Sequence, residues 1–109
     1  MPTVYRVLGQ VSPPALTEDL LYAVPPSTSA IGSSIIIANR GTSVATFRVS
    51  IAVNGAATLP KDYIYYDLPI GANDTFIATI GITLGDTDVV RVYASNSNLS
   101  FSLYGSEIS

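Results

Sequence analysis

The sequence predicts an all-β protein, a single antiparallel β-sandwich or jelly roll of about eight strands. Three observations lead to this prediction. Apolar and polar residues alternate with a period of two in several short segments, as in strands with one buried face. Turn residues interrupt these segments roughly every 8–12 residues, and no segment has a convincing helical pattern. The length of 109 residues implies one domain, residues 1–109.

The N-terminal segment places Tyr5 and Val7 on one face and Val4, Arg6 and Leu8 on the other. Two interpretations follow. The segment is the first strand of the domain or, taken as residues 1–12, a terminal arm that pairs with a neighbouring subunit. The proline pair in Ser12-Pro13-Pro14 ends any strand ladder, because proline donates no backbone hydrogen bond.

Residues 16–24 permit either a short helix capped by Thr17 or a strand. The following proline pair ends the segment too early for a stable helix, so we expect a strand. Residues 30–38 contain the run Ile35-Ile36-Ile37. A β-branched run of this kind predicts a strand covered on both faces, by the core on one side and by a partner subunit on the other.

Residues 44–53 have the clearest alternation in the chain, with Phe47, Val49, Ile51 and Val53 pointing the same way. Asn54-Gly55 is a typical hairpin signal, but the residues after it predict a longer connection.

Residues 61–68 form a tyrosine-rich strand. Its alternation puts Tyr63 and Tyr65 on one face, and Ile64, Tyr66 and Leu68 on the other. The breakers in residues 69–74 predict a loop.

Residues 74–104 predict three strands joined by two short turns, GDTD and NSN. Apolar residues alternate with small polar ones in the first strand (Phe76 to Leu84) and in the last (Leu99 to Leu103). We expect these three consecutive strands to form an antiparallel meander.

The composition points to contact with other proteins. Hydrophobic residues make up 48% of the chain, charged residues only 12%, and the mean hydropathy is +0.40. A small domain leaves much of its surface exposed, so it cannot bury this much apolar material by itself. No apolar run approaches the roughly 18 residues of a membrane span. Protein–protein contact, in an oligomer or a larger lattice, is the remaining explanation.

The charged residues and the N-terminal residues argue against several other classes of protein. The net charge is −3, and the five cationic side chains are scattered along the chain, so we expect no nucleic-acid binding. The start of the chain has neither the basic nor the apolar region of a secretory signal. The absence of cysteine excludes a disulfide framework.

Catalytic chemistry has few candidates. The chain contains no histidine and no cysteine, so neither a Ser–His or Cys–His nucleophile nor a conventional zinc site can be built. Two carboxylate pairs remain, Asp62 with Asp67 and Asp86 with Asp88, and each lies at a strand end or in a turn, where Asp is expected anyway. The second pair offers too few oxygens for a calcium loop. We therefore expect no enzymatic activity, no cofactor and no metal.

The seven tyrosines are the one enriched feature of the sequence. Tyrosine is over-represented at interfaces, because it offers a large amphipathic contact area at a low entropic cost. A sugar-binding surface would also use stacked aromatic rings. The predicted interface combines the N-terminal segment, the isoleucine run and the tyrosine-rich strand: Val4, Tyr5, Val7, Leu8, Ile35, Ile36, Ile37, Tyr63, Tyr65 and Tyr66.

Several blocks of the sequence resemble small virion proteins of tailed bacteriophages, including phages that infect cyanobacteria. The most specific blocks are ANRG (38–41), D-x-P-I-x-A-N-D-T (67–75) and G-I-T-L followed by D-x-x-x-V-Y-A-S-N (81–96). The likeness spans nearly the whole chain and identifies a fold family better than a position in the particle.

The resemblance implies a β-sandwich module that decorates or cements capsids, often as a trimer. Its partners would be further copies of itself and the major capsid protein or other virion proteins, with no nucleic acid and no membrane. Its location would be the virion, assembled in the host cytoplasm. Similar modules occur in tail and fibre proteins, so a tail, baseplate or fibre role with glycan binding through tyrosines is the alternative.

Overall fold

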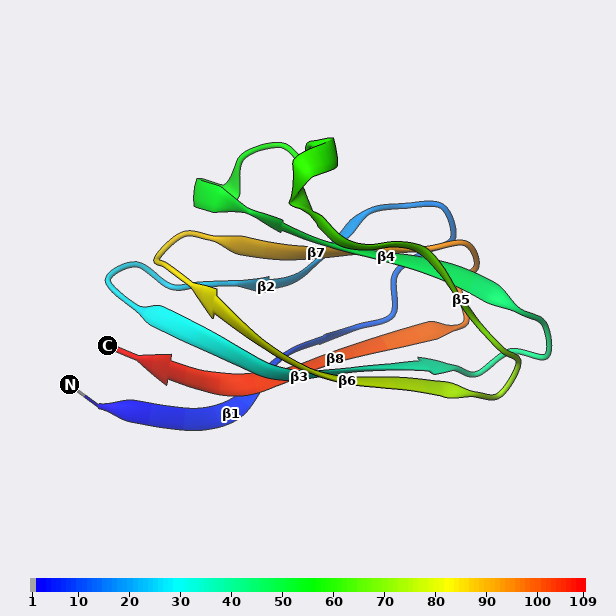
Figure 1. Ribbon diagram of the computed structural model, residues 1–109, viewed down its shortest axis with the longest axis horizontal. Helices are drawn as coiled ribbons and strands as arrows, with labels where there is room; N and C mark the ends of the chain where they lie inside the picture. The colour runs from blue at the N-terminus through cyan, green and yellow to red at the C-terminus, as the bar shows by residue number, and fades with distance from the viewer. Residues whose placement is uncertain (1) are drawn as a thin grey trace.

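The computed structural model describes residues 2–109 as two four-stranded antiparallel sheets packed face to face (Figure 1). Met1, the first residue of the predicted arm, lies outside the described residues. The strands are β1 (Thr3–Val11), β2 (Asp19–Ala23), β3 (Ser29–Asn39), β4 (Ala45–Ala52), β5 (Tyr63–Ile70), β6 (Thr75–Leu84), β7 (Val89–Ala94) and β8 (Leu99–Ile108). Two short 3-10 turns, η1 (Val53–Gly55) and η2 (Pro60–Asp62), interrupt the connection between β4 and β5.

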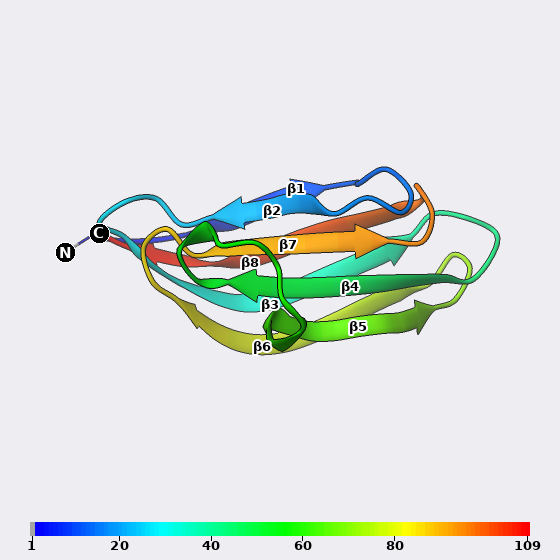
Figure 2. The same ribbon diagram turned by 90° about the horizontal axis from the view of Figure 1, so that it is seen from above.

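The strand order is that of a jelly roll. The first sheet has the order β1-β8-β3-β6, and the second has the order β2-β7-β4-β5. The chain therefore changes sheets at every connection except the one between β4 and β5. Seen from above, β1 and β2 lie along one side of the sandwich, and β5 and β6 lie along the other (Figure 2). The predicted all-β sandwich of about eight strands is confirmed.

The predicted meander of the last three strands is wrong. β6 pairs with β3, β7 lies between β2 and β4, and β8 lies between β1 and β3, so both short turns cross from one sheet to the other. Turn residues indicate where a chain reverses but not which strand it joins. Because a residue spans up to about 3.5 Å, a four-residue turn reaches both a neighbouring strand about 4.8 Å away and a facing sheet about 10 Å away.

The core lies between the two sheets and follows the predicted alternation. Phe47 of β4 is at its centre, with ring centroids 5.4 Å from Phe76 and 6.2 Å from Phe101, both in the opposite sheet. The fully buried side chains around it include Ile35, Ile37, Leu84, Leu99, Leu103, Val49, Val90 and Val92. Alternation thus identified the inward residues of β6 and β8, and Phe47 and Val49 of β4, correctly. The prediction that Val53 points the same way is wrong, because β4 ends at Ala52 and Val53 is exposed in η1.

A β-bulge in β5 changes the predicted faces of the tyrosine-rich strand. Tyr66 and Asp67 both lie opposite Arg48 of β4, and Asp67 has a positive φ of 51°. The extra residue turns Leu68 toward the core. The prediction that Leu68 shares an outward face with Ile64 and Tyr66 is therefore wrong.

Buried Asn39 joins two turns at one end of the sandwich. Its Nδ2 donates to the carbonyl oxygens of Ser43 (2.9 Å), Ile70 (3.2 Å) and Gly71 (3.1 Å). Its Oδ1 accepts a hydrogen bond from the backbone N–H of Gly41 (2.9 Å). The side chain therefore ties the β3–β4 turn, which contains the ANRG block, to the β5–β6 turn of the second block.

Residues 2–109 meet neither the requirements of a membrane-spanning helix nor those of a metal-binding cluster. No helix among them has the length and apolar character needed to cross a membrane. Nor do three or more His, Cys, Asp or Glu side chains gather among them in a way that could hold a metal ion.

Candidate interaction surfaces

The predicted interface residues do not form one surface. Ile35 and Ile37 are 0% exposed, and Leu8 is 8% exposed, so all three are core residues that a partner cannot reach. The reason is that β3 lies inside the first sheet, where alternation turns residues 35 and 37 toward the second sheet. Only Ile36 of the isoleucine run faces outward.

The N-terminal segment is a strand within the described chain. β1 pairs with β8 over its length, from Thr3 opposite Ile108 to Val11 opposite Phe101. Val4, Tyr5 and Val7 are exposed, and Tyr5 is the most exposed of them at 83%. β1 is also an edge strand, so one of its sides is unpaired within this chain.

The outer face of the first sheet carries no charge over four rows of cross-strand neighbours. We call it the uncharged face. Strand registers define its rows as Tyr5–Ser106–Ile31–Thr83, Val7–Tyr104–Ser34–Thr79, Gln10–Ser102–Ile36–Ile77 and Ser100–Ala38–Thr75. The rows themselves contain no residue with a formal charge at pH 7, although the chain has a net charge of −3. Arg40 lies at one end of the face, where its Nε donates to Oγ of Ser100 (2.9 Å). Depletion of charge is a feature that distinguishes the centre of an interface from ordinary protein surface.

The three predicted tyrosines of β5 have separate environments. Tyr65 lies at the edge of the core, with its ring centroid 6.0 Å from Phe47 and 5.3 Å from Phe76. Tyr63 and Tyr66 instead pack edge-to-face against each other, with ring centroids 4.9 Å apart. Tyr66 remains 58% exposed.

Tyr63 and Tyr66 form one wall of a hollow on the outer side of the second sheet. We call it the tyrosine hollow. The opposite wall comes from Thr58, Leu59 and Pro60, and the hollow, which is open to solvent, has a volume of about 580 Å³. This second wall belongs to the excursion of residues 53–62, which rises over the outer face of β4 and β7 (Figure 1).

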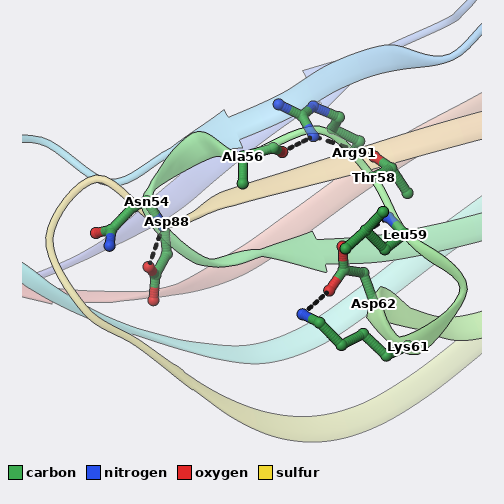
Figure 3. Close-up of polar contacts among 8 residues, drawn as sticks. All are labelled: Asn54, Ala56, Thr58, Leu59, Lys61, Asp62, Asp88 and Arg91. Atoms are coloured by element: carbon green, nitrogen blue, oxygen red, sulfur yellow. Dashed lines mark hydrogen bonds and ion pairs between the residues drawn. The ribbon is translucent and has the colours of Figure 1, made fainter.

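Arg91 of β7 fixes the excursion to the sheet (Figure 3). Its Nη1 donates to the carbonyl oxygen of Ala56 (2.7 Å) and to Oγ1 of Thr58 (3.0 Å), and its Nη2 donates to the carbonyl oxygen of Gly55 (3.1 Å). Asp88 adds a contact at the start of the excursion, because its Oδ1 accepts a hydrogen bond from the backbone N–H of Asn54 (3.0 Å). These bonds hold Thr58 in place as part of the wall.

Asp62 fixes the other end of the excursion (Figure 3). Its Oδ2 accepts a hydrogen bond from the backbone N–H of Leu59 (2.8 Å), and its Oδ1 forms an ion pair with Nζ of Lys61 (3.1 Å). The Leu59 hydrogen bond, and secondarily the Lys61 contact, hold the pKa of Asp62 below its ordinary value. Asp62 thus serves as the cap of η2.

Arg48 lies beside the hollow and supports Tyr66. Its guanidinium stacks on the ring of Tyr66 (4.3 Å from Cζ to the centroid) and on that of Tyr93 (4.4 Å). Its Nε donates to Oδ1 of Asp67 at 2.7 Å, and the pKa of Arg48 is raised chiefly by this hydrogen bond. Arg48 therefore contacts Tyr66 and Tyr93 on either side, and Asp67 pairs with its charge.

The arrangement suits a neutral ligand with both apolar and hydroxyl groups. The hollow offers aromatic edges, an apolar Leu–Pro pair and hydroxyl groups, and its volume lies in the range of small-molecule sites. Three of the four carboxylates considered for catalysis have structural contacts: Asp62 caps η2, Asp67 pairs with Arg48, and Asp88 accepts a hydrogen bond from the N–H of Gly85 (2.9 Å).

The sequence did not identify Thr58, Leu59, Pro60, Arg48 or Tyr93 as site residues. The one sequence signal for any of them was the alternation within residues 44–53, which placed Arg48 on the outward face. Its stacking partners come from strands whose pairing with β4 becomes visible only in the fold.

Comparison with solved structures finds chains from virus particles. The chain aligns over 97% of its length with 32% of a chain from infectious bursal disease virus, Gx strain (TM-score 0.58, 13% identity). It aligns over 97% of its length with 29% of a chain from the T13 viral particle of the same virus (TM-score 0.55, 11% identity). The chain thus spans about a third of the length of these bursal disease virus chains.

A third match has a similar length. The chain aligns over 99% of its length with 98% of a chain from the acid-stable capsid of Helicobacter pylori bacteriophage KHP30 (TM-score 0.51, 14% identity). Identities this low show a shared fold alone. No protein-family model matches the chain, and no curated protein matches it. These findings define the class of fold, a jelly-roll domain, which also occurs in the virus chains named above.

Proposed function

We propose that this chain is a structural protein of a bacteriophage virion, and specifically a capsid decoration or cement protein without catalytic activity. The observation that carries this proposal is the uncharged face, a four-stranded outer surface whose rows contain no charged residue, with Arg40 only at one end, in an acidic protein. Its jelly-roll fold, which recurs in chains of virus particles, and the resemblance to small phage virion proteins support the proposal.

The uncharged face is large enough to act as an attachment surface. Four strands about 4.8 Å apart and about 33 Å long cover a plan area of roughly 19 by 33 Å. Side chains that project from the sheet make the accessible area larger than this plan area. It thus approaches the area that a stable interface buries, about 800 Å² per partner. Because the rows contain no charged residue, burial of their Ile, Val and Tyr side chains is not offset by the cost of desolvating a charge within them.

In this proposal the chain acts mechanically in the virion, which assembles in the host cytoplasm. A homotrimer, the state that the resemblance implies, would sit on the shell and bridge copies of the major capsid protein. Exposed Tyr5 and Val7 extend the uncharged face along β1, so the N-terminal segment contributes to capsid contact as a strand of the sheet.

The test is binding of the purified protein to phage capsids that lack it, followed by imaging of the decorated particles. Ser102 lies in the middle of the uncharged face, and Ser102→Lys should reduce capsid binding at least tenfold. Val53→Lys is the matched control, because Val53 is exposed on the excursion of the other sheet. Equal binding by both variants, or density for this chain only in the tail, would contradict the decoration role.

The tyrosine hollow favours a second candidate, a tail, baseplate or fibre module that binds host glycans. Tyr63 and Tyr66 present aromatic surface beside the Thr58 hydroxyl, and sugars combine these apolar and hydroxyl requirements. A glycan array with the purified protein tests this function. Tyr66→Ala should abolish binding, and Tyr5→Ala, which alters an exposed tyrosine on another sheet, should not.

A further inference from the structure

The edges of the two sheets differ in how well they are protected against pairing with another strand. Sheet edges present unpaired backbone groups, and proteins protect them with charges, prolines, bulges or short strands. Within residues 2–109 the edge strands are β1, β2, β5 and β6. β2 has only five residues, and β5 contains Pro69 and two register shifts. β1 contains Arg6 and a register shift at Leu8.

β6 has the least protection. It has ten residues, TFIATIGITL, with no charged residue and no proline. Its one irregularity is a bulge at Gly81, which has a φ of 58° and lies beyond a regular segment from Thr75 to Ile80. Ile77 in the middle of this segment is 67% exposed.

The strand register shows which backbone groups of β6 are unpaired. The N–H of Asn39 donates to the carbonyl oxygen of Asp74 (2.9 Å), so the β6 residues with even numbers up to 78 direct their backbone groups toward β3. Thr75, Ile77 and Thr79 therefore direct their N–H and C=O groups toward the free edge. Their side chains all lie on the uncharged face.

We propose that β6 pairs antiparallel with β6 of a second copy of this chain, across a two-fold axis at Ile77. In this register Ile77 lies opposite its own copy, and Thr75 lies opposite Thr79 on each side of the axis. Each of these pairs exchanges two hydrogen bonds, so about six main-chain bonds satisfy all three residues of each strand. The two first sheets become one continuous eight-stranded sheet.

The charges favour a second copy as the occupant. Two chains with a net charge of −3 repel each other wherever their charged surfaces meet, but the Thr75–Ile80 segment and the uncharged face bring no charges together. The cross-strand pairs are also favourable, since they match Ile with Ile and Thr with Thr. Addition of a strand to an exposed edge is an established mode of recognition in which main-chain bonds supply affinity.

The experiment measures the mass of the purified protein by analytical ultracentrifugation, without phage particles. Ile77→Lys places two like charges opposite each other at the axis. It should reduce the assembly mass by a factor of two, from a dimer to a monomer or, where the chain also forms the proposed trimer, from paired trimers to single trimers. Thr83→Lys adds the same charge to the same strand beyond the bulge, and it should leave the mass unchanged. Both side chains are exposed, and near-ultraviolet circular dichroism checks that each variant keeps its core packing.

A cysteine cross-link tests the register directly. The chain has no cysteine, and residues in a hydrogen-bonded antiparallel pair have Cα atoms about 5.5 Å apart, which suits a disulfide. Ile77→Cys should form a covalent dimer on mild oxidation, and Thr83→Cys should remain uncross-linked.

Several results would overturn the proposal: an unchanged mass for Ile77→Lys, equal cross-linking by both cysteine variants, or a wild-type protein that is monomeric and pairs only with another virion protein. Because no capsid is present, these results are distinct from a failure of the proposed virion function.

Discussion

At the scale of single residues, the buried side-chain amide of Asn39 makes the most specific set of hydrogen bonds. Asn39 is 2% exposed, and both ends of its side chain are used, with Nδ2 facing three carbonyl oxygens and Oδ1 facing one N–H. An amide is the one side-chain group of this size that supplies donors and an acceptor without charge. Asn39 thereby explains why the ANRG block and the loop after β5 come together.

Replacement of Asn39 should therefore be costly, and its cost should depend on the substituent and on pH. Asn39→Ala leaves buried carbonyl oxygens unpaired, and we expect a loss of about 2–3 kcal/mol in the free energy of unfolding. Asn39→Asp keeps the shape but aims a carboxylate at those oxygens, which disfavours the charged form in the folded state. Its carboxyl pKa is then raised on folding, so the loss should grow as pH rises above about 4.

Urea unfolding at about pH 4 and about pH 7 measures both effects. The Asn39→Ala variant is the control, since it has no new titratable group. An Asn39→Asp variant whose destabilisation is the same at both pH values would show that the introduced carboxylate does not face the carbonyl oxygens.

Asp62 gives a second pH dependence at this scale. The Leu59 N–H and Lys61 hold the pKa of Asp62 below its ordinary value, so its contribution to stability is present above the unfolded-state pKa and is lost as pH falls through the folded-state pKa. Wild-type protein should lose more thermal stability between about pH 7 and about pH 3 than Asp62→Asn, which cannot ionise. Equal losses in a pair of melting curves would show that the cap contributes nothing.

At the scale of elements, the excursion of residues 53–62 shows that the local sequence can predict the length of a connection but not its contacts. The residues after Asn54-Gly55 predicted a longer connection than a tight hairpin, and the structure has two short 3-10 turns there. What the connection covers was not predictable, because Arg91, which holds it, lies in β7 and is far away in the sequence.

Loss of the Arg91 contacts should loosen the excursion but not the sandwich. Arg91→Met keeps an unbranched apolar stem and removes all three hydrogen bonds to the excursion. Amides of residues 55–59 should exchange with solvent at least tenfold faster, and those of β4 and β8 should not. Hydrogen exchange followed by mass spectrometry measures this, with Arg6→Met on the exposed β1–β8 pair as the control. Uniform acceleration across the chain would contradict a local role.

At the scale of the whole molecule, the rows of the uncharged face contain no charged residue, and Arg40 lies only at one end of it. The chain also leaves large apolar side chains exposed, among them Leu16, Val44, Val53, Leu59 and Ile77. This pattern agrees with the inference from composition that part of the apolar surface contacts other proteins. The fold shows where the uncharged face lies, which is on the outer side of the sheet β1-β8-β3-β6.

Self-association through the β6 edge, which borders the uncharged face, should therefore be insensitive to salt. Contacts between exposed charges weaken as the Debye length falls from about 30 Å at 0.01 M salt to about 3 Å at 1 M, whereas apolar and main-chain contacts do not. Sedimentation across this range of sodium chloride should give the same assembly mass. Dissociation at high salt would indicate that ion pairs hold the copies together and would contradict pairing through the β6 edge.

The class of fold, the inward faces of β6 and β8 and the inward direction of Phe47 and Val49 in β4 could all be predicted from the sequence alone. The period-two alternation of Phe47, Phe76 and Phe101 with their neighbours is a local property of each strand. The tertiary structure alone decided that Ile35 and Ile37 are core residues, that β7 lies in a different sheet from β6 and β8, and that Tyr63 and Tyr66 share a hollow with residues 58–60. Alternation follows from the geometry of one strand, whereas pairing, register and bulges depend on contacts between residues far apart in the chain.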